Sequence, residues 1–89
     1  MQIKTRAHNL LDDWGHYREL HYSNKTHFAN ALDIEIEKDT ISQLVPQLHE
    51  ALITGKDLTP VVESLALHLR TYKDRITFEL LKNGINPNG

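Results

Sequence analysis

Apolar residues recur at three- and four-residue steps along most of the chain, the spacing of helices that bury one face. The pattern is longest in the last third, between Thr59 and Gly84. Thr59 can cap the first free N–H groups, Pro60 needs no donor in the first turn, and Gly84 can adopt the left-handed conformation that ends a helix. We therefore predict one long helix over residues 60–83. At about 36 Å it would exceed the diameter of so small a domain, so part of it should need cover from a second copy or another macromolecule.

The first third of the chain predicts another helix, over residues 4–22. Its apolar side chains recur on one face and comprise Ile3, Ala7, Leu10, Leu11, Trp14 and Tyr17. Gly15 lies in the middle of this helix, where glycine costs about 1 kcal/mol relative to alanine. We therefore expect Gly15 either to admit a closely packed partner helix or to mark a kink. A turn signal at Ser23-Asn24 then precedes a short second helix that includes Phe28.

Residues 32–37 show a different pattern, in which apolar and acidic residues alternate. A period of two is typical of a strand, and the apolar members are Leu32, Ile34 and Ile36. A lone strand would have no ladder partner, so we expect an extended connector here, with pairing across a dimer or with a target as the alternative. A capping box at Thr40 then predicts a helix over residues 40–55. Because Pro46 disrupts a helix interior, this helix either kinks near Ser42, or a short turn ends and a new helix begins with Pro46 near its first position.

These elements predict an all-α fold, a small bundle of about four helices in one domain, residues 1–85, followed by a disordered polar tail, 86–89. A chain of 89 residues is long enough for one modest core. It contains no cysteine, which excludes disulfides and fits a cytoplasmic location. We expect no secretory signal and no membrane span. The formal net charge of -2 argues against general nucleic-acid binding by phosphate neutralisation.

Catalytic motifs are missing from the sequence. There is no cysteine nucleophile, glycine-rich phosphate loop or G-x-S-x-G elbow, so we predict that the protein is not an enzyme and uses no cofactor. One metal-binding arrangement remains as an alternative, because His8, Asp12 and His16 are spaced four residues apart on the first predicted helix. Histidine and carboxylate are ligands of Zn, Ni and Fe. The simpler interpretation is a solvated helix face with a contact between histidine and aspartate.

Large apolar side chains of the first and last helices are the candidate contacts to a protein partner: Trp14, Tyr17, Leu69, Tyr72, Ile76 and Phe78. Aromatic residues at such positions are more often core or interface anchors than platforms for stacked bases. The last helix also carries four basic residues that could contact phosphates: Arg70, Lys73, Arg75 and Lys82. Because acidic residues lie among them, we interpret them first as charges that support the helix. The acidic segment 35–39 offers a further alternative, a mimic of a nucleic-acid backbone that occupies a basic groove on a target.

Residues 10–17, Leu-Leu-Asp-Asp-Trp-Gly-His-Tyr, resemble the opening Leu-Leu-x-x-Trp-Gly-x-aromatic segment of bacteriophage late-gene antiterminator proteins of the Q type and their relatives. Members of this family are phage regulators that act on host transcription complexes. The resemblance thus implies a protein of phage or mobile-element origin that binds and redirects a host macromolecule. The final third of the chain departs from the family pattern, because it has neither the turn signals of a helix-turn-helix motif nor a cysteine cluster. The family's route to DNA recognition is therefore not implied.

The sequence leads to three functional hypotheses. The first is a small non-catalytic regulatory or inhibitory module that binds a host protein or macromolecular complex, with a homodimer through the last helix as one form of it. The alternative is a transcription regulator linked to nucleic acid through the basic residues of the last helix. The third is a metal-binding helical protein that uses His8, Asp12 and His16.

Overall fold

The computed structural model describes residues 2–28 and 31–86, and three α-helices account for most of this part of the chain. Helix α1 spans Ile3–Ser23, α2 spans Leu32–Thr54 and α3 spans Thr59–Lys82, with a short 3-10 helix, η1, at Lys25–Phe28. The described residues contain no strand. The all-α prediction is confirmed, and the bundle has three α-helices rather than about four.

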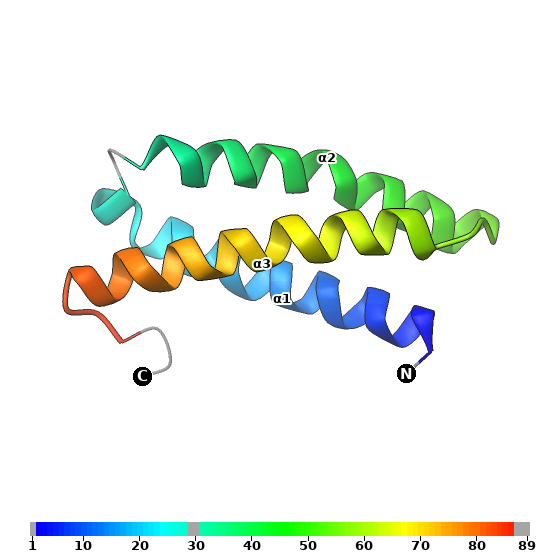
Figure 1. Ribbon diagram of the computed structural model, residues 1–89, viewed down its shortest axis with the longest axis horizontal. Coiled ribbons are helices and arrows are strands. Elements are labelled where there is room, and N and C mark those ends of the chain that lie inside the picture. The colour runs from blue at the N-terminus through cyan, green and yellow to red at the C-terminus, as the bar shows by residue number, and fades with distance from the viewer. Residues whose placement is uncertain (1, 29–30, 87–89) are drawn as a thin grey trace.

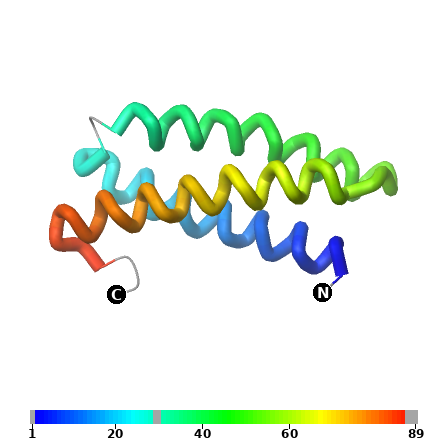
Figure 2. The backbone as a smooth tube through the Cα atoms, in the orientation of Figure 1, coloured from blue at the N-terminus to red at the C-terminus, as the bar shows by residue number. Residues whose placement is uncertain are grey.

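Successive helices run in opposite directions, so that α2 is antiparallel to both α1 and α3 (Figure 1). Helix α3 packs closely against both of the others, whereas α1 and α2 approach each other much less. Away from this turn α1 and α2 diverge (Figure 2). The molecule measures 43 × 24 × 17 Å, and its smallest dimension is less than two helix diameters. The bundle is therefore elongated, and α3 is the helix that packs closely against both others.

The core is built from one stripe on each helix. On α3 the buried stripe comprises Val62, Leu65, Leu69, Tyr72, Ile76 and Leu80. It is covered along its length by the chain's own α1 and α2. With 24 residues, α3 is hardly longer than α2 with 23 or α1 with 21. The expected overhang of the last helix is therefore wrong, because its neighbours are nearly as long as it is and cover its buried stripe.

The extended connector expected at 32–37 is wrong as well, because these residues form the first turns of α2. Ile34, Ile41 and Leu48 are spaced seven residues apart and are fully buried, which is a helical repeat. Leu32 and Ile36 are 72% and 57% exposed. The alternation thus places apolar residues on two opposite helix faces, and only one of them faces the core.

Helix α2 is also longer than the segment 40–55 because Thr40 is an interior residue and not a cap. Its hydroxyl donates a hydrogen bond to the Ile36 carbonyl, 3.1 Å away. The helix continues through Pro46 and bends in that half (Figure 1), so a new helix does not begin there. The short helix expected around Phe28 is a 3-10 turn that ends at this residue. The predicted tail, 86–89, lies outside the described residues except for Asn86.

No helix of the described segments combines the length and apolar content that crossing a membrane requires.

Gly15 lies on the exposed side of α1, and a Cβ added there would meet open space. No partner helix approaches it, so the close-packing interpretation is wrong. We expect Gly15→Ala to stabilise the fold by about 0.5–1 kcal/mol, because alanine loses less backbone entropy than glycine in a helix interior. Urea unfolding followed by circular dichroism measures the change. An unchanged or lower stability would show that residue 15 contacts something beyond this chain's own helices.

Candidate functional site

His21 is the buried polar side chain of the described core, with 1% of its surface exposed. It occupies the last turn of α1, seven residues after the buried Trp14 and fourteen after the buried Ala7. Its ring lies edge-on to Phe28 of η1 and to Tyr72 of α3, with centroid distances of 5.0 and 5.8 Å. His21 therefore lies where α1, η1 and α3 meet, and its outer edge faces α2.

Both ring nitrogens of His21 have partners. Nδ1 lies 2.8 Å from the Tyr72 hydroxyl, and Nε2 lies 3.2 Å from Oε1 of Glu35 on α2. An ionised carboxylate only accepts hydrogen bonds, so Nε2 carries the proton of the neutral ring, and Nδ1 accepts from the Tyr72 hydroxyl. The other oxygen of Glu35 accepts from Lys38 Nζ at 2.8 Å. A continuous chain of polar contacts thus runs from buried Tyr72 to the surface.

Electrostatics keep His21 neutral in this chain. Burial lowers the pKa of His21 below its ordinary value of 6.5, the Glu35 carboxylate opposes this shift, and the ammonium groups of Lys38 and Lys25 add to it. The hydrogen bond from Lys38 lowers the pKa of Glu35. Burial raises the pKa of Tyr72. At neutral pH the chain of contacts therefore consists of neutral Tyr72, neutral His21, ionised Glu35 and charged Lys38.

The chemistry available to His21 is limited by its lack of solvent access. A general base must reach a proton of the substrate, and a side chain that is 1% exposed cannot do so in this conformation. The Trp14 ring, 5.6 Å from that of Tyr72, covers the same region. The arrangement fits a structural contact between helices better than a substrate-binding site.

Within the described residues, no group of three or more His, Cys, Asp and Glu side chains could hold a metal ion. His8, Asp12 and His16 are exposed along the outer side of α1. His8 and His16 are eight residues apart, about 12 Å along a helix axis. Ligand atoms must all lie about 2 Å from one zinc ion, so these three side chains cannot share it. The ring of His16 instead contacts Tyr17, with a centroid distance of 5.0 Å.

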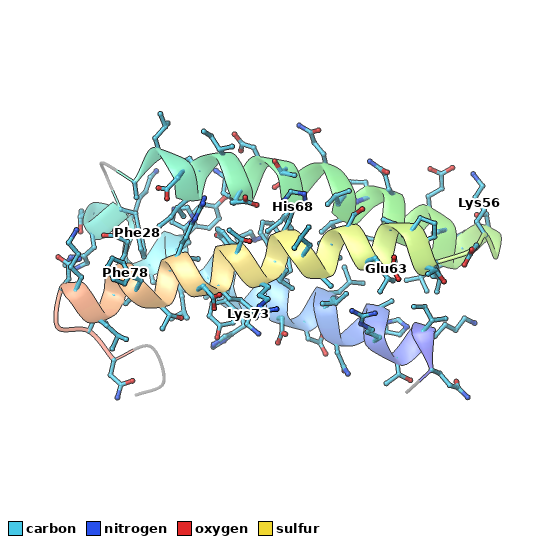
Figure 3. All side chains as sticks on the ribbon, in the orientation of Figure 1. Phe28, Lys56, Glu63, His68, Lys73 and Phe78 are labelled. Atoms are coloured by element: carbon cyan, nitrogen blue, oxygen red, sulfur yellow. The ribbon has the colours of Figure 1, made fainter. Side chains whose placement is uncertain are left out.

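The four basic residues of α3 do not share one surface. Lys73 faces α1, where its Nζ lies 3.4 Å from Asp13 Oδ2 and 5.3 Å from the Tyr17 ring centroid. Arg75 faces α2, where its Nε lies 3.5 Å from Asp33 Oδ2. Figure 3 shows Lys73 on the side of α3 toward α1 and His68 on the side toward α2. Arg70 and Lys82 are exposed.

The acidic segment of α2 makes internal contacts. Glu37 lies 3.0 Å from His68 Nδ1 of α3, and Glu35 contacts His21 and Lys38. Asp39 is the most exposed acid of this segment, with a side chain 69% exposed, compared with 41% for Glu35 and 17% for Glu37. An acidic residue already paired within the chain is less available to imitate a phosphate backbone.

The six candidate interface residues separate into three groups. Four of them belong to the core: Trp14, Leu69, Tyr72 and Ile76, all at most 6% exposed. Tyr17 is half-buried. Phe78 is 65% exposed, so among the six it is the side chain best placed to meet a partner.

Phe78 lines a shallow groove of about 250 Å³ between the start of α2 and the end of α3, which we call the α2–α3 groove. Its lining residues are Asp33, Ile34, Asp74, Arg75, Phe78 and Glu79. Leu32, Ile36 and Leu81, which are 57–72% exposed, lie on the same end turns of these two helices. These ends are adjacent in Figure 1. Sequence analysis did not identify this group, because its members lie on two helices whose pairing the sequence does not show.

The segment that resembles phage antiterminators contributes to the core of this chain. Trp14 is buried, and Leu10, Leu11 and Tyr17 are half-buried against the core. These positions are therefore constrained by packing in α1, whatever their other role. Comparison of the chain with protein-family models, with curated proteins and with solved structures finds no match.

Proposed function

We propose that the protein is a small non-catalytic helical module that binds a protein partner at the end of the bundle that carries the α2–α3 groove. The observation that supports this most is the exposure of Phe78, at 65%, beside a core whose own apolar stripe is fully buried. Folding of the chain alone gives no reason for a phenylalanine at this position. Aromatic anchors of this kind dominate the free energy of many protein interfaces.

Further exposed apolar side chains lie on the same end turns of the two helices. Leu32 and Ile36 lie one turn apart on α2, 72% and 57% exposed, and Leu81 follows Phe78 by three residues on α3, at 60%. Single exposed apolar residues are normal on soluble proteins. Four of them on the adjoining ends of two helices favour a protein contact. The pair of Arg75 and Asp33 at the groove provides a polar rim.

The resemblance of residues 10–17 to phage regulators supports a regulatory or inhibitory role for this binding, with a host macromolecular complex as the target. Phosphate recognition is less favoured, because Lys73 and Arg75 face opposite sides of α3 and each contacts a carboxylate.

Site-specific photo-crosslinking tests the proposed surface. We expect a photoreactive residue at position 78 to yield a defined protein adduct in cells of the native host. The matched control is position 53, because Ile53 is 85% exposed at the other end of α2, away from the groove. An adduct from position 78 that Ile36→Ser weakens would support the surface. Equal adducts from both positions, no adduct, or an adduct with nucleic acid alone would contradict it.

A further inference from the structure

Helix α1 is held in the bundle by fewer buried side chains than either of the other helices. It contributes three buried side chains, compared with four from α2 and six from α3. Its N-terminal end diverges from α2 (Figure 1), and a pocket of about 610 Å³ opens there between residues 2–4 and the end of α2 with the following loop. One of the three buried contacts is His21, beside the turn that leads to α2. Besides the half-buried Leu10, Leu11, Tyr17 and Leu20, the attachment of α1 thus includes one buried titratable side chain.

Protonation of His21 is incompatible with the contacts that now satisfy it. The neutral ring accepts a hydrogen bond at Nδ1 from the Tyr72 hydroxyl, 2.8 Å away. A protonated ring has no acceptor, so both nitrogens would donate. The Tyr72 hydroxyl would have to reverse and accept, which would leave its own proton in a fully buried site without the acceptor that it now uses. Burying such an unpaired donor is unfavourable.

Charged and titratable groups face His21 from each element packed against it. From α2, Glu35 favours the protonated ring and Lys38 opposes it. From η1, Lys25 also opposes it. Tyr22 of α1 stacks on the ring at 5.8 Å, and Tyr72 of α3 is kept neutral by burial, so neither supplies a counter-charge. Among the groups that the described residues place against the ring, Glu35 thus supplies the compensating charge. At 41% side-chain exposure it is partly screened by water, and it is shared with Lys38.

We propose that His21 is a pH-sensitive clasp whose protonation releases α1 from the α2–α3 hairpin while the hairpin stays folded. This inference is independent of the proposed partner surface, because the hairpin alone carries the α2–α3 groove. Because the pKa of His21 is lowered in the closed form and returns toward 6.5 when the ring is hydrated, the open form binds more protons. Acidification from neutral pH to about 5 therefore favours opening. Above about pH 5, Glu35 remains ionised because its pKa is lowered also.

Hydrogen exchange of the full chain at pH 7.5 and pH 5, corrected for intrinsic rates, tests the clasp. We expect exchange in α1 to increase at pH 5 by up to about tenfold for each unit by which the pKa of His21 is lowered. Exchange in the α2–α3 hairpin should change much less. His21→Gln, whose amide can accept from Tyr72 and donate to Glu35 but cannot be protonated, should remove the difference. His68→Gln is the matched control, because His68 also contacts a glutamate but lies between α2 and α3.

A second measurement keeps the test decisive if His21→Gln fails to fold. In the unaltered chain, the ring resonances of His21 should titrate at the same pH midpoint as the opening of α1. The fluorescence of Trp14, buried on α1 against Tyr72, should report the same transition. Simultaneous loss of protection in all three helices, a His21 titration with no opening of α1, or an unchanged response in His21→Gln would overturn the clasp.

Discussion

Leu69→Ala should destabilise the fold by about 2–5 kcal/mol, whereas Leu67→Ala, on the same helix, should change its stability by no more than about 0.5 kcal/mol. Leu69 is 1% exposed at the centre of the α3 stripe, and Leu67 is 66% exposed on the outer face. The first substitution removes buried apolar surface and leaves a cavity. The second removes a side chain that is already largely in water.

Urea unfolding followed by circular dichroism measures both changes under the same conditions. Because the two substitutions remove the same atoms from the same helix, effects on helix propensity cancel in the comparison. Domains of this size have total stabilities of about 5–15 kcal/mol, so the loss at Leu69 would be a large fraction of the whole. Equal losses at both positions would show that the outer face of α3 is also buried, and would therefore favour a second copy or a partner covering Leu67.

The helices that bury a single continuous stripe could be predicted from the sequence. The last helix was expected at 60–83 and spans Thr59–Lys82, and the first was expected at 4–22 and spans Ile3–Ser23. Helix α2 could not be delimited in this way, because Leu32 and Ile36 are apolar residues on its solvent face. Together with Ile34 they form an apparent alternation of apolar and acidic residues, which obscures the seven-residue spacing of Ile34 and Ile41. A local apolar pattern does not show which helix face is buried until the element that packs against each face is known.

The site was less predictable than the fold because it depends on contacts between distant segments. His21 meets Tyr72, 51 positions away along the chain, and nothing in the sequence around either residue indicates the pairing. The spacing of Ala7, Trp14 and His21 at steps of seven was an available signal, since it places the histidine on the buried face. Phe78 was identified as an interface residue together with Leu69, yet only Phe78 is exposed. An amphipathic pattern alone cannot separate core anchors from surface anchors.

The core role of Trp14 gives the second large expected effect. Trp14→Ala should destabilise the fold by about 3–5 kcal/mol. The indole is 6% exposed, its ring centroid lies 5.6 Å from that of Tyr72, and the Arg18 guanidinium lies 5.5 Å above it. Removing it deletes the largest of the three buried side chains that attach α1 to α3. The free energy of unfolding from urea titration measures the loss.

Tyr22→Ala is the matched control, because Tyr22 is an aromatic residue of the same helix that is 52% exposed. Tyr22→Ala should cost much less, since the Tyr22 ring contacts the His21 ring and the Lys38 ammonium near the surface. Because α1 is held by few buried side chains, the amides of α1 should lose exchange protection in Trp14→Ala before those of α2 and α3. If all three helices lost protection equally, α1 would belong to the same cooperative unit as the hairpin, and a local release of α1 by acid would be excluded on energetic grounds.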